Sequence, residues 1–430
     1  MELSLKNVGV ESECGKLDIV IMHRPGDELL RLNNDNIETL LFDNIPNLNE
    51  SQQSHDIFTK YLRDNGTHVL YIRELLEETL VSSKQACQTL IDGIVAHSSL
   101  NYSYQSSQAK LFLYQWLYER TPVQLVDDII RGVTCSLNQL GISKSAKTLL
   151  KICDKSINEF IIPPLPNLLF TRDAFSIIEK NVFIWKMAKH ARQNEPLIYR
   201  VIFKYHPYLS ISDLNLIEWE NQCYNDEKVS AEGGDIAYLG NGILLIGCSE
   251  RTNRAGIESI ALTDIFQRII VVTLPAQREF MHLDTIISSI NPHAFTLHSA
   301  LNNSMQVFTV EIKDKNNKFV EKPKWISHGF DVRQSLRYLL NKPDLIFYDA
   351  LDKITSVKEQ RDCCLNVLSI DEYHIVTYAD GDSNRGIVAA IKHNDTTCKI
   401  GLIPTKGLLE GGGGTHCMTN ALRRHRSLKY

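Results

Sequence analysis

Short apolar runs alternate with helical stretches along most of this chain of 430 residues. Each run is four or five residues long and rich in aliphatic or aromatic residues, a pattern typical of short buried strands. The runs of the second half lie at residues 243–246, 269–272, 345–348, 374–378 and 400–403. Strands that alternate with helices favour repeated α/β units over a β-sandwich. We therefore predict an α/β fold, although no strict sequence repeat is visible.

The first seventy residues begin the same alternation. Residues around Ile19 form a β-rich run that stops at the turn signal Arg24-Pro25-Gly26. Residues 51–64 place apolar side chains at helical spacing, and Asn65-Gly66 is the stop signal of a helix. A strand at 69–72 follows, so this part of the chain predicts a strand-helix-strand unit.

Between about residues 73 and 156 the pattern changes to apolar residues at helical spacing, with few glycines and a single proline, Pro122. This part of the chain predicts a helical bundle inserted into the α/β fold. The prolines of Pro163-Pro164-Leu165-Pro166 end the helices, and short β runs resume after them.

The composition excludes several classes of protein. The net charge of -5 comes from interspersed acidic and basic residues, so the chain has no basic stripe for nucleic acid and no polybasic anchor for an acidic membrane. Its first six residues lack the basic and apolar segments of a signal peptide, and no run approaches the length of a membrane span. We therefore expect a cytoplasmic protein with no nucleic acid or membrane partner.

The ten cysteines are scattered along the chain, which indicates reduced thiols and not a disulfide framework. No Cys-x-x-Cys or His-x-x-x-His pair offers zinc ligands at the usual spacing, so a structural metal site is not expected. The adjacent Cys363 and Cys364 are interpreted as two ordinary thiols.

One cysteine stands out by its surroundings. The glycines 411–414 precede Cys417 by a few residues, and glycines without Cβ atoms let the backbone bend sharply and let a ligand come close. The thiol then has open space in front of it and could act as a nucleophile. The simpler interpretation is a flexible loop followed by a buried cysteine.

Four more strings place polar residues beside predicted strands, where a folded scaffold holds them rigidly. They are residues 166–173, 232–235, 250–252 and 282–285. Each has a structural explanation when taken singly: Asp173 as a helix cap, His282 as a hydrogen-bonded core histidine, and Glu232-Gly233-Gly234-Asp235 as a turn. What distinguishes them is their order along the chain, which ends at Cys417.

Taken together and in this order, the strings resemble the arginine deiminases of the guanidine-modifying, or pentein, superfamily. Further strings carry the resemblance over nearly the whole chain: residues 15–17, 23–26, 40–46 and 203–207. The resemblance implies a five-bladed α/β propeller in which each blade is a ββαβ unit. It also implies one catalytic domain over residues 1–430, with the helical bundle at 73–156 as an insertion within it.

The resemblance implies that the chain hydrolyses L-arginine to L-citrulline and ammonia. A guanidinium is a planar, resonance-stabilised cation, so attack at its carbon needs a strong nucleophile and carboxylates that hold its plane. Cys417 would attack the carbon and form a covalent S-alkylthiouronium intermediate, while Asp173 and Asp284 accept hydrogen bonds from the nitrogens. His282 would carry the protons, and Glu232 would orient it.

The positions that match the family's binding residues for the amino-acid end of the substrate are Asn167, Arg192 and Arg251, with Phe170 along the aliphatic stem. Two arginines suit a free α-carboxylate, whereas a surface salt bridge is the ordinary explanation for an arginine taken singly. The resemblance implies no metal and no organic cofactor, and it implies a homo-oligomer.

The chain departs from the family pattern at Gly412, because the family commonly has an arginine five residues before the cysteine. The strings at 362–366 and 380–384 also keep the pattern only in part. Two other activities on the same scaffold therefore stay open, an arginine dihydrolase that yields ornithine and an agmatine deiminase, as does a relative that binds arginine without catalysis. Arg192 and Arg251 speak against agmatine, which has no carboxylate.

Overall fold

The computed structural model describes residues 5, 7–98, 106–134, 160–219, 223–224, 227–313, 316–379 and 381–425. Within this part of the chain, five β-sheets have three or more strands, and all five share one plan. Two strands form an antiparallel pair, and one of them pairs in parallel with a third strand that follows after a helix. This repeated ββαβ unit confirms the prediction of a five-bladed α/β propeller.

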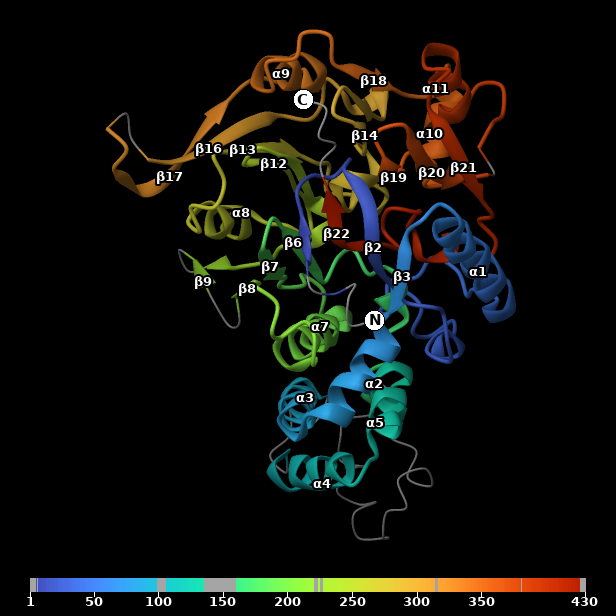
Figure 1. The fold of residues 1–430 in the computed structure, drawn as a ribbon, viewed down its shortest axis with the longest axis vertical. Coiled ribbons are helices and arrows are strands. Elements are labelled where there is room, and N and C mark those ends of the chain that lie inside the picture. The colour runs from blue at the N-terminus through green and yellow to red at the C-terminus, as the bar shows by residue number, and fades with distance from the viewer. Residues whose placement is uncertain are drawn as a thin grey trace.

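The first blade joins the two ends of the described chain (Figure 1). β22 (Asn420–His425) pairs antiparallel with β2 (Lys16–Met22), and β2 pairs in parallel with β3 (His68–Tyr71) after α1 (Leu48–Asp64). β1 (Gly9–Val10) pairs in parallel with β22 on its other side. Strands from both ends of the chain therefore close the propeller.

The other four blades follow in chain order. The second contains β6 (Phe175–Ile178), β7 (Asn181–Ile184), α7 (Asn194–Tyr205) and β8 (Asn215–Glu218). The third contains β11 (Ile236–Gly240), β12 (Ile243–Cys248), α8 (Arg254–Ala261) and β13 (Arg268–Thr273). The fourth contains β14 (Ser289–Asn291), β15 (Ala294–Thr296), α9 (Val332–Leu339) and β18 (Ile346–Tyr348). The fifth, preceded by α10 (Lys353–Arg361), contains β19 (Leu368–Asp371), β20 (His374–Tyr378), α11 (Ile387–Asn394) and β21 (Lys399–Ile403).

Local sequence explains where α1 begins and ends. The side chain of Asn47 accepts a hydrogen bond from a backbone N–H of the first turn, so the helix starts slightly earlier than predicted. Gly66 takes a left-handed φ of 87° just after the helix, which glycine adopts without strain. Phe58 and Leu62, the apolar residues at helical spacing, are fully buried. The amphipathic pattern therefore fixes which face of α1 packs on the first sheet.

A helical layer lies beside the propeller, at the lower end of Figure 1. It contains α2 (Ile72–Ser82), α3 (Lys84–His97), α4 (Ser106–Tyr118) and α5 (Pro122–Arg131). Both α2 and α3 pack against α7 of the second blade. α5 begins with a capping box between Thr121 and Gln124, with Pro122 in its first turn.

The boundaries of this layer differ in part from the sequence prediction. Ile72, predicted as the last residue of a strand, is the first residue of α2, because the helical apolar pattern begins there. After α5, the short β4 (Val133–Thr134) pairs with β5 (Phe160–Ile162). Residues 135–156 of the predicted insertion lie outside the described residues, as does Asp380 of the string at 380–384.

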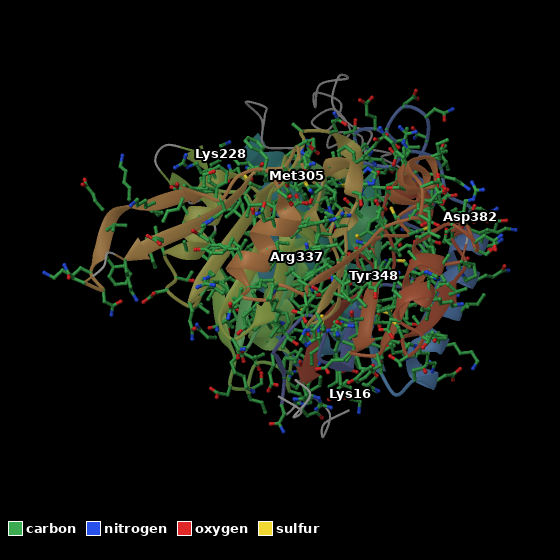
Figure 2. The ribbon with its side chains drawn as sticks, turned by 90° about the horizontal axis from the view of Figure 1, so that it is seen from above. Lys16, Lys228, Met305, Arg337, Tyr348 and Asp382 are labelled. Carbon is green, nitrogen blue, oxygen red and sulfur yellow. The ribbon has the colours of Figure 1, made fainter. Side chains whose placement is uncertain are left out.

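Two strands that the sequence did not reveal form a hairpin on the third blade. β16 (Val307–Lys313) and β17 (Phe319–Ser327) extend its sheet and project from the body of the molecule (Figures 1 and 2). β17 contains charged residues on both faces, so it lacks the apolar run used to find the other strands. The short β9 (Cys223–Tyr224) and β10 (Glu227–Lys228) pair with each other. No helix in the described part of the chain has the length and apolar character needed to cross a membrane.

Candidate active site

Each blade contributes the segment just before its first strand to one shared site. These segments hold Asp173 before β6, Glu232 before β11, Asp284 before β14, Asn366 before β19 and Cys417 before β22. Equivalent positions in a ring of blades lie near the common axis, so residues far apart in sequence meet there. The strings at 166–173, 232–235 and 282–285 and the one that ends at Cys417 are therefore equivalent parts of successive blades, whereas the string at 250–252 follows β12 within the third blade.

Hydrogen bonds tie these segments to one another in turn. The second and third blades meet where Gly234 donates its backbone N–H to Oδ1 of Asp173 at 3.1 Å. The third and fourth blades meet where Leu283 donates its backbone N–H to Oδ1 of Asp235 at 2.9 Å. Both acceptors are buried carboxylates, which holds the backbone of the neighbouring blade in a fixed position.

The remaining contacts close the ring through Asn366. Its Nδ2 donates to the backbone carbonyl of Asp284 at 3.0 Å, and its Oδ1 accepts from the backbone N–H of Cys417 at 3.0 Å. The backbone carbonyl of Cys417 in turn accepts from Arg172 N–H of the second blade at 3.1 Å. Cys417 is therefore fixed by its backbone on both sides.

A small cavity of about 20 Å³ lies among these segments. Seven of the nine predicted site residues line it: Asn167, Phe170, Asp173, Arg192, Arg251, His282 and Cys417. Glu232 and Asp284 do not line the pocket but contact residues that do. All nine side chains are buried, so the structure brings together every residue that the sequence selected.

The glycine run closes one side of the pocket. Gly413 lies so close to the ring of Phe170 that a Cβ atom on it would be 2.4 Å from a ring carbon. Such a contact requires glycine, so the run allows close packing against the pocket wall, as the sequence indicated. Cys417 is nonetheless buried, in agreement with the simpler interpretation of that cysteine.

The thiol of Cys417 donates to Oδ2 of Asp284, with 3.5 Å between Sγ and the oxygen. Burial, together with Asp284 and Asp173, raises the pKa of the thiol well above its ordinary value. Oδ1 of Asp284 is buried and has no hydrogen-bond partner among the described residues. The site therefore holds a protonated thiol beside a carboxylate oxygen that can still accept a hydrogen bond.

His282 lies between two carboxylates. Its Nε2 is 2.8 Å from Oε2 of Glu232, and its Nδ1 is 3.6 Å from Oδ1 of Asp173. Burial lowers the pKa of His282, but Asp173, Glu232 and Asp235 outweigh it and raise the pKa to about 9. The imidazole is therefore protonated at neutral pH and can act as a general acid.

The two predicted carboxylate-binding arginines pair with acids of the protein. Arg192 places Nη1 at 2.5 Å from Oδ2 of Asp173, and its other nitrogens contact Glu195. Arg251 places Nη1 at 3.3 Å from Oε2 of Glu232 and Nε at 3.0 Å from Oε1 of Glu250. These cations offset the cost of burying several carboxylates close together.

Sequence reasoning missed a second layer of charged residues under Asp284. His416 lies 2.8 Å from Oδ2 of Asp284 through Nδ1 and 2.7 Å from Oε1 of Glu13 through Nε2. Arg172 contacts the other oxygen of Glu13 at 3.0 Å. Since each ring nitrogen of His416 faces a carboxylate, both nitrogens carry a proton and the ring is an imidazolium. The one signal in the sequence is the position of His416 directly before Cys417.

Asp173, Glu232 and His282 offer three ligand atoms within 4.8 Å of one another, the spacing of a possible metal site. Arg192 and Arg251 already pair with the two carboxylates, and the ring of His282 is protonated. Protein cations therefore satisfy the negative charge of this group and a proton occupies its nitrogen ligand, so the three residues as arranged do not fit a metal site.

Comparison with known proteins places the chain among enzymes that act on guanidines. The family model "Arginine deiminase" matches residues 38–424. The arginine deiminase of Limosilactobacillus fermentum is 32% identical over 424 residues, which cover 96% of this chain and 97% of that protein. The arginine deiminase of Listeria monocytogenes is 30% identical over 426 residues, covering 97% of this chain and 98% of that protein.

Among solved structures, an amidinotransferase of the saxitoxin biosynthetic pathway from Microseira wollei superposes with a TM-score of 0.54. The match covers 98% of this chain and 99% of that chain at 15% sequence identity. At this identity the match supports a shared fold and says nothing of the substrate.

Proposed function

This chain belongs to the arginine deiminase family, and we propose that its pocket hydrolyses L-arginine to L-citrulline and ammonia. The observation that carries the proposal is the pairing of a nucleophile with an available acceptor: Cys417 Sγ lies beside Asp284, whose Oδ1 is buried without a partner among the described residues. A buried carboxylate oxygen of this kind fits an N–H donor of a cationic ligand.

A guanidinium suits the charges around the pocket. Asp173 and Asp284 would accept hydrogen bonds from its nitrogens and hold its plane in front of the thiol. To bind Asp173, the substrate replaces the guanidinium of Arg192, which is then free to bind the α-carboxylate. Arg251 and Asn167 complete the binding of the amino-acid end, and Phe170 contacts the aliphatic stem.

The same cation prepares the nucleophile. Buried carboxylates keep the Cys417 thiol protonated, but a guanidinium beside it favours the thiolate. The thiol proton passes to Asp284, to which Sγ is hydrogen bonded, and sulfur attacks the guanidinium carbon. His282 then gives its proton to the departing nitrogen, ammonia leaves, and a cationic S-alkylthiouronium remains on Cys417.

Hydrolysis restores the enzyme. The neutral His282 takes a proton from water as the oxygen adds to the same carbon. The carbon–sulfur bond then breaks, and the sulfur leaves as thiolate and takes back its proton from Asp284. The product loses a proton, which leaves with ammonia as ammonium, and citrulline results. Glu232 holds His282 in both steps through its 2.8 Å contact and favours the protonated ring with which the first step begins and the second step ends.

The direct test is product analysis. Purified protein incubated with L-arginine should release citrulline and ammonia in equal amounts, and mass spectrometry of the acid-quenched reaction should find an arginine-derived mass on Cys417. A turnover no higher than that of Cys417→Ala contradicts the proposal. Release of ornithine, or a preference for agmatine, supports one of the sister activities.

Three further proposals rest on the family. We propose that residues 1–430 form one catalytic domain with 73–156 as an insertion, that the protein is a homo-oligomer, and that it is cytoplasmic. The full-length match to curated relatives supports the single domain. Light scattering of the purified protein tests the assembly, and cell fractionation tests the location.

A further inference from the structure

Residues 33–46, named here the cover segment, contribute to the wall of the pocket through Leu41. The segment folds on itself through backbone hydrogen bonds and buries the side chains of Leu40 and Phe42. Leu41 between them takes a left-handed φ of 66°, a conformation that is uncommon for residues other than glycine. Contacts from outside the segment are therefore needed to hold its tip in this conformation.

Three contacts connect the tip of the cover segment to the rest of the pocket. Nδ2 of Asn167 donates to the backbone carbonyl of Leu40 at 2.7 Å. The backbone N–H of Asp43 donates to the carbonyl of Glu410, next to the glycine run, at 2.9 Å. The third contact is made by Arg278.

Arg278 binds two points of the segment at once. Its Nε donates to Oδ1 of Asp43 at 2.6 Å, and its Nη2 donates to the backbone carbonyl of Leu41 at 2.8 Å. Arg278 also lines the pocket and precedes His282 by four residues. It therefore connects the cover segment to the part of the fourth blade that carries the proposed acid.

Gly412 shows why this arginine matters in this chain. It has a left-handed φ of 77°, and a Cβ atom on it would lie 3.3 Å from Oδ2 of Asp43. A side chain at this position would thus start beside the same acid that Arg278 binds. Gly412 has no side chain that could bind Asp43, so Arg278 provides the cation at this acid.

We propose that Arg278 is a positioning residue that holds the cover segment closed over the pocket through Asp43 and Leu41. The inference rests on the proposed function, because it assigns a gate to that pocket. Arg278 and Asp43 are 35% and 50% exposed. Ion pairs this exposed are weak, so the pair can open for substrate entry at little cost to the fold.

Access to Cys417 tests the gate without any need for turnover. The variants Arg278→Gln and Asp43→Asn are treated with iodoacetamide, a small neutral reagent, and alkylation of Cys417 is followed by peptide mass spectrometry. We expect about five- to tenfold faster alkylation in both, because the open segment is more populated.

The two variants change the charge near Cys417 in opposite directions, which separates access to the thiol from electrostatic effects on its pKa. Removing the cation raises the pKa of the nearby thiol and slows alkylation, whereas removing the carboxylate has the opposite effect. Acceleration in both variants therefore reports access. The double variant should react no faster than Arg278→Gln, since that change already breaks the ion pair that Asp43→Asn removes.

Arginine kinetics give a second measurement. Each variant should raise KM about tenfold and change kcat by less than about threefold, because the gate affects binding and not the reacting groups. Arg278→Lys should restore part of the lost affinity, since it keeps the charge but not the two-point contact.

Arg361→Gln is the matched control. Arg361 pairs with Glu279, the residue after Arg278, and this pair is also on the surface. Wild-type alkylation rates and KM values in both gate variants would overturn the proposal, and so would equal effects in Arg361→Gln. If the wild-type protein forms no citrulline, the proposed function fails, while the alkylation rates still decide the role of Arg278.

Discussion

Arg192 places Nη1 at 2.5 Å from Oδ2 of Asp173, so a guanidinium of the protein lies on the carboxylate that we assign to the substrate guanidinium. Both side chains are buried, and breaking the pair without a replacement leaves two buried charges. A ligand that carries both a guanidinium and a carboxylate provides a partner for each. The pair therefore favours L-arginine over amines that lack the carboxylate.

The first prediction concerns this exchange, in which Arg192 and Asp173 leave each other and bind the carboxylate and the guanidinium of the substrate. Arg192→Lys should lower kcat/KM for L-arginine about 100-fold, because one ammonium group cannot keep the contacts that Nε and Nη2 make with Glu195 and also replace Nη1 at the carboxylate. Its kcat/KM for agmatine should change much less, since agmatine has no carboxylate to lose. The measurement is the ratio of the two values. The control is Arg200→Lys, at a residue of α7 that pairs with Glu218 outside the pocket. An unchanged ratio in Arg192→Lys contradicts the exchange.

The second prediction is an alkaline limit to activity set by His282. The pKa of this group is raised to about 9, so the fraction of protonated acid falls as the pH rises through that value. A plot of log kcat/KM against pH should therefore decline above about pH 9, if the measured limit follows this group. Since Glu232 helps to raise the pKa, Glu232→Gln should move the limit to lower pH.

The control variant is Glu250→Gln. The alkaline limit of kcat/KM should move further in Glu232→Gln than in this control. Glu250 pairs with Arg251 at the edge of the same site but does not contact His282. An alkaline limit at the same pH in wild type and Glu232→Gln would show that another group sets it.

Much of the site could be predicted because its residues stand in local strings. Cys417, His282 and Asp173 each belong to a motif that is recognisable from its neighbours. The order of these motifs carried the resemblance to the arginine deiminases, and the resemblance implied the propeller. Apolar runs located seven strands: β2, β3, β12, β13, β18, β20 and β21. In β2, β12, β13 and β20 consecutive residues are buried, so both faces of these strands are covered and the run marks them directly.

The rest could not be predicted because it depends on contacts between distant segments. Glu13 is 403 positions from His416, and neither residue has a local motif that points to the other. The pairing of Arg192 with Asp173 is likewise a property of packing and not of spacing. The strand β17 carries charged residues on both faces and has no continuous apolar run, so its sequence resembles that of a loop.

The third prediction tests the imidazolium under Asp284. His416→Gln removes the cation that contacts both Asp284 and Glu13, so two buried carboxylates lose a charged partner. We expect the free energy of unfolding to fall by about 1–3 kcal/mol, as measured by urea denaturation at pH 7. The pKa of Asp284, which is lowered because the hydrogen bond and charge of His416 outweigh the effect of burial, should rise.

A buried histidine outside the site provides the comparison. His298→Gln removes a histidine that contacts Ser356 and no carboxylate. It should leave kcat within about threefold of wild type, whereas His416→Gln should reduce kcat more than tenfold by misplacing Asp284 beside the thiol. Equal losses in the two variants would mean that His416 acts only through packing.

The fourth prediction concerns acid stability and a residue far from the pocket. His55 on α1 is fully buried, and neither ring nitrogen has a hydrogen-bond partner among the described residues. Burial, helped by the nearby His23, lowers its pKa from 6.5 to about 3. Between these two values the unfolded chain binds a proton that the folded chain does not.

The free energy of unfolding therefore falls as the pH decreases from 6.5 towards 3, and at pH 5 His55 accounts for a loss of about 2 kcal/mol. His55→Leu cannot bind this proton, so it should lose less stability than wild type between pH 7.5 and pH 5 when both are unfolded in urea. His68→Leu, at an exposed position on β3, should lose as much as wild type. Apart from His55 and His68, every titrating group is common to the three proteins. An equal loss of stability in all three would show that His55 is already hydrated or paired in the folded state.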